Sequence, residues 1–141
     1  MTDFTMTATI PEPYDIVVER VRKLLPDAGF GVLTEIDIQA TLRAKLGVET
    51  PPQLILGACR PQLAHRALQA DPRVATMLPC NVVVAAEGSG VTRVAVFDPA
   101  LMASLSDAPD LADVTMDARG RLSAMMSALA GGEDDPDATR T

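Results

Sequence analysis

The segment that most restricts the fold of this chain is a pair of apolar runs joined by a glycine turn. Residues 81–87 read NVVVAAE, residues 88–90 read GSG, and residues 91–98 read VTRVAVFD. Such a pattern is typical of a β-hairpin, because β-branched side chains suit strands and glycine accepts the backbone angles of a tight turn. The chain is therefore expected to contain an antiparallel β-sheet.

The rest of the chain alternates between strand and helix patterns. Apolar runs predict strands at residues 2–10, 30–36 and 53–59, and apolar spacings of three and four predict helices at 14–25, 38–46, 61–70 and 110–130, with shorter helical turns at 73–78 and 99–105. Asp37 is expected to cap the second helix and Pro61 to begin the third, while Pro26 and Gly29 end the first. Five strands, a tight hairpin and intervening helices predict an α+β fold.

Length and charge limit the number of domains and the classes of partner. The chain has 141 residues, enough for one ordinary domain, which we assign to residues 1–130. Residues 131–141 contain four acidic side chains and are expected to form a disordered acidic tail. The net charge of −7 opposes binding to nucleic acid, because proteins hold phosphate backbones mainly through Lys and Arg.

Targeting and cysteine patterns indicate a cytoplasmic protein. No apolar run approaches the roughly 18 residues that a membrane-spanning helix needs, and the first residues do not resemble a signal peptide. The two cysteines are too few for a secreted disulfide framework, and no standard zinc-ligand spacing is present. We therefore expect no membrane contact, no cofactor and no assigned metal ligands.

The strand at residues 81–87 has apolar side chains on both of its faces. Residues 82–86 read VVVAA, whereas the helices of so small a domain are expected to pack on one face of the sheet. The simplest cover for the other face is a second copy of the chain. The sequence therefore predicts a homodimer.

Two cysteines form the main chemical candidate. Cys59 ends a strand and precedes Arg60 and the Pro61 helix start, where a helix N-terminus and a cation both favour the thiolate. The alternative is that Cys59 is simply the last buried residue of its strand. Cys80 begins the next strand, and whether the two sulfurs approach closely enough to pair stays open at this stage.

Three further residues are candidates for a pocket near the cysteines: Arg60, His65 and Glu35. His65 falls opposite the apolar side of its predicted helix, which favours a solvated side chain. Glu35 lies beside Asp37, which already has a role as a helix cap. Two cysteines and one histidine could bind a metal, although their spacings match no standard set of ligands.

Four segments together resemble the domain of unknown function 302 family. They read GFGVLTEIDIQATLRAKLG, LILGACRPQLAHRALQADP, LPCNVVV and RVAVFDPALM, and the resemblance runs from about Phe4 to Met102. The matching motif positions are Gly29, Gly31, Glu35, Asp37, Gly57, Pro61, Leu78, Pro79, Cys80, Asp98 and Pro99. Most of them are explained as turns, caps or helix starts, whereas Cys80 has no evident structural reason to be cysteine.

The resemblance implies a fold similar to a single TATA-binding-protein-like repeat, a curved antiparallel sheet with helices on one face, paired as a homodimer. It implies no catalytic residues, because the family has no established activity. DNA binding does not follow from such a fold, since the surface would need to be basic and this chain is acidic.

Three functions remain open at the level of sequence. The first is a nonenzymatic cytoplasmic homodimer that binds a small ligand or a protein partner. The second is a thiol-based redox or sulfur-handling protein that uses Cys59 and Cys80. The third is a metal-binding module.

Overall fold

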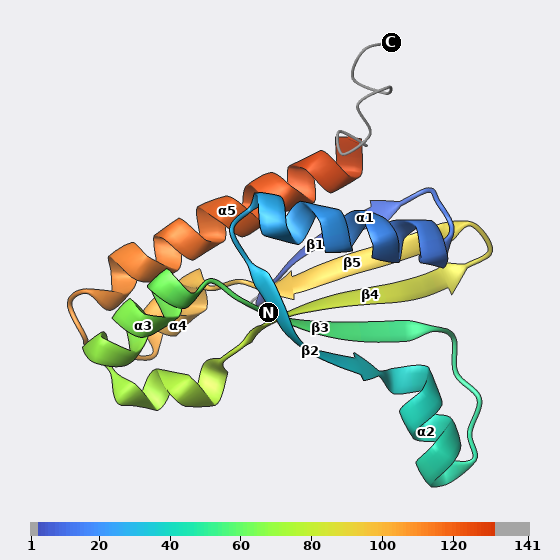
Figure 1. The fold of residues 1–141 in the computed structure, drawn as a ribbon, viewed down its shortest axis with the longest axis horizontal. Coiled ribbons are helices and arrows are strands. Elements are labelled where there is room, and N and C mark those ends of the chain that lie inside the picture. Colours follow the sequence, from blue (N-terminus) through green and yellow to red (C-terminus); the bar gives the residue numbers. More distant parts are fainter. Residues whose placement is uncertain (1–2, 132–141) are drawn as a thin grey trace.

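The structure is a computed structural model that describes residues 3–131, and it has an α+β fold (Figure 1). Its elements are β1 (Thr5–Ile10), α1 (Tyr14–Asp27), β2 (Gly31–Asp37), α2 (Ile38–Leu46), β3 (Gln53–Cys59), α3 (Pro61–Ala70), η1 (Pro72–Met77), β4 (Cys80–Gly88), β5 (Val91–Phe97), α4 (Ala100–Ser104) and α5 (Leu111–Gly131). The predicted acidic tail falls almost entirely outside the described residues. No helix within residues 3–131 is long and apolar enough to cross a membrane.

The five strands form one open antiparallel sheet in the order β1-β5-β4-β3-β2. The hairpin of β4 and β5 lies at its centre, as the valine-rich segment predicts, and β2 forms one edge. Figure 1 shows α1 and α5 lying together across one face of the sheet. The fold class predicted from sequence is confirmed.

Local sequence explains most of the element boundaries. The Asp37 carboxylate accepts a hydrogen bond from the Ala40 N–H at 2.9 Å and caps α2, which ends at Gly47 with a φ of 68°. One prediction was wrong, because α1 continues through Pro26 to Asp27. Proline is tolerated in this last turn, where its carbonyl oxygen accepts from the Gly29 N–H at 2.9 Å.

The core lies between the sheet and the helices, and it is aliphatic. Val82, Val84 and Val94 have no exposed surface, and they lie on the sheet face that α1 and α5 cover. The helices add further fully buried side chains from their apolar stripes, including Val17, Val21, Leu25, Leu111, Leu122 and Leu129. The low aromatic content of the chain is therefore matched by a core of Val, Leu, Ile, Ala and Met.

The opposite sheet face carries a row of apolar side chains from four adjacent strands. Strand pairing sets Ile36 beside Ile55, Ile55 beside Val83, and Val83 beside Ala95. Ile36 is 45% exposed, whereas Ile55, Val83 and Ala95 are half-buried. We call these four residues the open-face row.

Candidate functional site

A cavity of about 40 Å³ lies where the ends of β3 and β4 meet α3 and α5. Its lining is almost wholly apolar and includes Phe30, Ala58, Leu63, Ala67, Leu78, Met102, Val114 and Ala118. A water molecule needs roughly 10–15 Å³ of such space and several polar partners, which this lining offers sparsely. The cavity is therefore suited to an apolar group of a few heavy atoms.

Both cysteines line this cavity. Cys80 pairs in the sheet with Ala58, so Cys59 and Cys80 lie at neighbouring strand ends, and both are free thiols. Burial raises the pKa of Cys80 to about 11, and the charge of a Cys59 thiolate adds to this effect. Burial also raises the pKa of Cys59.

The raised pKa of Cys59 differs from the sequence-based expectation that Arg60 and the α3 N-terminus favour its thiolate. Loss of solvent is the cause of the shift. Arg60 directs Nη1 to the Gly29 carbonyl oxygen, at 3.4 Å. At neutral pH both sulfurs are therefore expected to be protonated thiols.

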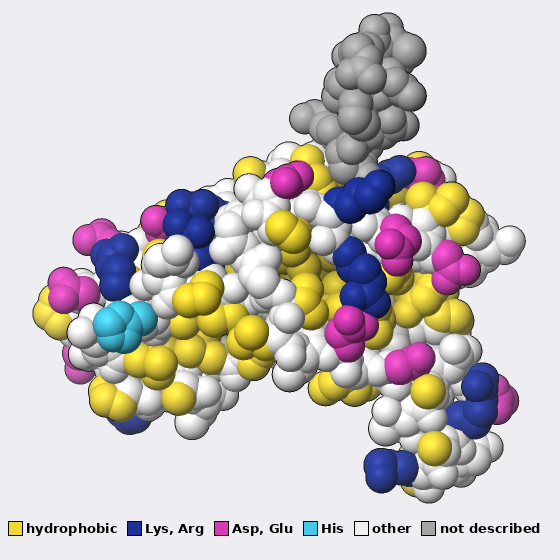
Figure 2. Space-filling view, in the orientation of Figure 1, with side chains coloured by type: hydrophobic (Ala, Val, Ile, Leu, Met, Phe, Trp, Pro, Cys, Tyr) yellow, Lys and Arg dark blue, Asp and Glu magenta, His cyan; other side chains and the backbone are white. Residues whose placement is uncertain are grey.

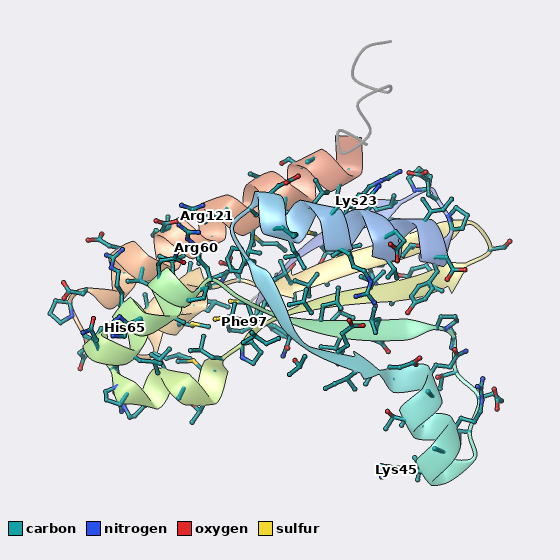
Figure 3. All side chains as sticks on the ribbon, in the orientation of Figure 1. Lys23, Lys45, Arg60, His65, Phe97 and Arg121 are labelled. Atoms are coloured by element: carbon teal, nitrogen blue, oxygen red, sulfur yellow. The ribbon has the colours of Figure 1, made fainter. Side chains whose placement is uncertain are left out.

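A second arginine lies beside Arg60 at the C-terminal end of α1. Arg121 on α5 donates from Nη1 to the Ala28 carbonyl oxygen at 3.3 Å and from Nε to Asp117 at 2.7 Å. A side chain at Gly29 would overlap the Arg60 guanidinium and lie 3.3 Å from Arg121 Nη1. Figure 3 shows Arg60 and Arg121 next to each other between α1, α3 and α5.

The three candidate pocket residues do not form one pocket, so this prediction was wrong. Arg60 lines the cavity, but His65 is exposed on the outer side of α3 (Figures 2 and 3). Glu35 lies in a separate groove between α1 and β2, where both its oxygens accept from the Arg22 guanidinium at 2.7 Å. These hydrogen bonds lower the pKa of Glu35.

Sequence reasoning missed Phe30, Met102 and Arg121 as parts of this region. Phe30 and Met102 read as ordinary apolar residues, and Arg121 lies on a helix outside the resembling segments. Within residues 3–131, no group of three or more His, Cys, Asp or Glu side chains could hold a metal ion.

The family model for Domain of unknown function DUF302 matches residues 6–129. The chain belongs to the DUF302 family. A crystal structure of an uncharacterized conserved DUF302 protein from Bacillus stearothermophilus is similar, with a TM-score of 0.80 and 29% sequence identity, covering 89% of this chain and 98% of that one. No curated protein matches the chain.

The DUF302 match extends the resemblance seen in the sequence. It reaches residue 129 and so includes α5 almost to its end, and α5 supplies one wall of the cavity. Two motif glycines are explained by close packing. A Cβ at Gly57 would overlap Thr34 Oγ1 and lie 2.8 Å from Pro79 Cγ, and Gly29 has a φ of 90°.

Proposed function

We propose that this protein is a nonenzymatic cytoplasmic homodimer that binds a small apolar ligand in the cavity between the sheet, α3 and α5. The observation that carries the proposal is the almost wholly apolar lining of that cavity. The partly exposed side chains of Cys59 and Arg60 also line it. Apolar pockets with a few polar groups at their edge are the usual form of small-molecule sites. The raised pKa of both cysteines opposes catalysis by a thiolate.

Titration with 1-hexanol, an uncharged apolar probe, tests the proposal. We expect saturable changes in the NMR signals of Leu63, Met102 and Val114, which line the cavity. Ala118→Leu fills the cavity from α5 and should abolish these changes. Ala124→Leu, the same substitution at an exposed position of the same helix, should leave them intact. Nonsaturable or scattered changes in the native protein would contradict the proposal.

The homodimer in this proposal is supported by the open-face row. Its four side chains are uncharged, so two copies can meet there without direct repulsion although the chain has a net charge of −7. A C2 interface requires a surface that complements itself, and an apolar row meets that condition. The α2 helix is consistent with further cover, because it buries none of its own residues.

A second candidate function is thiol chemistry, favoured by the position of Cys59 and Cys80 at neighbouring strand ends in one cavity. With hydrogen peroxide as oxidant, the two thiols would lose two electrons and two protons to form a disulfide and two waters. Mass spectrometry after peroxide treatment tests this function. Loss of two hydrogens per chain would support it, and two unmodified thiols would exclude it.

A further inference from the structure

We propose that the ligand of the cavity is a small organic acid whose carboxylate is bound by Arg60 and Arg121. The inference rests on the proposed function and adds the chemical class of the ligand. Arg60 belongs to both parts of the site, since it lines the cavity and also lies beside Arg121.

The hydrogen bonds of Arg60 leave part of its guanidinium without a partner. Its Nη1 makes one long bond to the Gly29 carbonyl oxygen, at 3.4 Å, and its Nε is buried with no hydrogen-bond partner in the described part of the chain. No carboxylate within residues 3–131 forms an ion pair with Arg60. Buried N–H groups are normally paired, so this donor indicates an absent acceptor.

The positive charges of the two arginines are also only partly neutralised. Asp117 pairs with Arg121, and the Gly29 and Ala28 carbonyl oxygens accept one bond each from the two guanidinium groups. These carbonyls end α1, which has no basic residue in its own last turn, so one role of both arginines is to stabilise that helix end. That role uses the Nη1 of each arginine, and one of the two positive charges has no carboxylate partner among residues 3–131.

A carboxylate is the acceptor that this arrangement suits best. A guanidinium binds a carboxylate through two parallel N–H donors, which makes arginine more selective for this group than lysine. The apolar part of the same molecule would enter the cavity past the Arg60 stem. Since the cavity measures about 40 Å³, it has room for about three carbons at the end of a short alkyl chain.

Paired titrations of the full chain with hexanoate and 1-hexanol test the inference by calorimetry. The two probes share the alkyl chain and differ in the charged group. We expect hexanoate to bind about tenfold more tightly, a ratio that corresponds to about 1.4 kcal/mol. Added salt should reduce this preference, because mobile ions screen partly exposed charges.

Substitutions then locate the carboxylate. Arg60→Gln and Arg121→Gln should each bring the ratio of the two affinities, hexanoate over 1-hexanol, close to one, because each removes a positive charge that only hexanoate uses. Arg60→Lys should retain part of the preference. Arg66→Gln removes an exposed charge from α3 and should change neither affinity.

The outcomes separate the two claims. Equal affinity for hexanoate and 1-hexanol would overturn the acid-binding inference and leave the proposed function standing. Failure of both probes to bind would overturn both. A preference that persists in Arg60→Gln and Arg121→Gln would place the carboxylate elsewhere and also overturn the inference.

Discussion

Cys80 is a motif residue whose sequence context offers no structural reason for cysteine, and the structure places it in the wall of the cavity. Burial raises its pKa from 9.0 to about 11, so the folded protein holds the thiol proton more tightly than the unfolded chain does. The contribution of this thiol to the free energy of unfolding is fully present below pH 9 and is lost as the pH rises through about 11.

We therefore predict an alkaline loss of stability that depends on Cys80. Two pKa units correspond to about 2 to 3 kcal/mol of unfolding free energy. Denaturant unfolding at about pH 8, 9, 10 and 11 measures this loss in the native protein and in Cys80→Ala. The variant should show a clearly shallower pH dependence, and parallel curves for the two proteins would contradict the assignment.

Gly57 provides a second prediction for a single residue. Gly57→Ala should destabilise the fold by about 1 to 3 kcal/mol, because the new Cβ overlaps Thr34 and Pro79 across the strands. Gly120→Ala is the matched control, since its Cβ meets nothing within 4 Å and lies in helix α5, where alanine should stabilise by about 0.5 to 1 kcal/mol. Thermal unfolding compares the stability of the two variants. An unchanged stability of Gly57→Ala would contradict the prediction, because it would show that the sheet accommodates the added Cβ.

At the level of elements, α2 behaves as a local unit. It buries none of its residues, and the Asp37 cap and the Gly47 end fix its length. Asp37→Ala should weaken α2 by about 1 kcal/mol and leave the unfolding of the whole chain nearly unchanged. Amide hydrogen exchange measures this loss as faster exchange confined to α2. Lys45→Ala, on the same helix but not a cap, should have little effect, and exchange that rises throughout the sheet in Asp37→Ala would contradict the account.

The sequence predicts elements well where the cause is local. The boundaries of α2, β3 and α3 follow from Asp37, Gly47 and Pro61, and the hairpin follows from its valines and glycines. The end of α1 lies two residues beyond the predicted one, because the Pro26 carbonyl oxygen accepts from the Gly29 N–H and the last turn closes after the proline. Arg121 joins the site from 61 positions beyond Arg60, and helical periodicity on α5 carries no information about which distant loop it meets.

The candidate site was only partly predictable for the same reason. The antiparallel pairing of β3 with β4 places Cys59 near Cys80, a proximity that the sequence left open. Glu35 and His65 belong elsewhere, because Glu35 faces Arg22 of α1 and His65 lies on the exposed side of α3. Residue type identified the chemical candidates, and only packing decided which of them share a cavity.

At the scale of the whole molecule, the proposed homodimer predicts that one charge on the open-face row separates the two copies. Ile36→Glu should weaken dimerisation by about 100-fold, since a carboxylate would be buried against an apolar surface. The change should leave the chain folded, because Ile36 is already 45% exposed. Sedimentation equilibrium measures the mass, which should fall from twice the monomer mass to the monomer mass.

Leu105→Glu is the control for this prediction. Leu105 is 67% exposed and lies between α4 and α5, outside the open-face row. This variant should remain dimeric. A native protein that sediments as a monomer, or an Ile36→Glu variant as dimeric as the native protein, would contradict the proposed interface.

The central claim, that the cavity binds a small apolar molecule, is tested most directly by a crystal structure of the protein equilibrated with saturating 1-hexanol. We predict electron density for the terminal carbons of the alkyl chain among Phe30, Leu63 and Ala118, with the hydroxyl end toward Arg60. An empty cavity at saturation, or alcohol bound only outside it, would contradict the account.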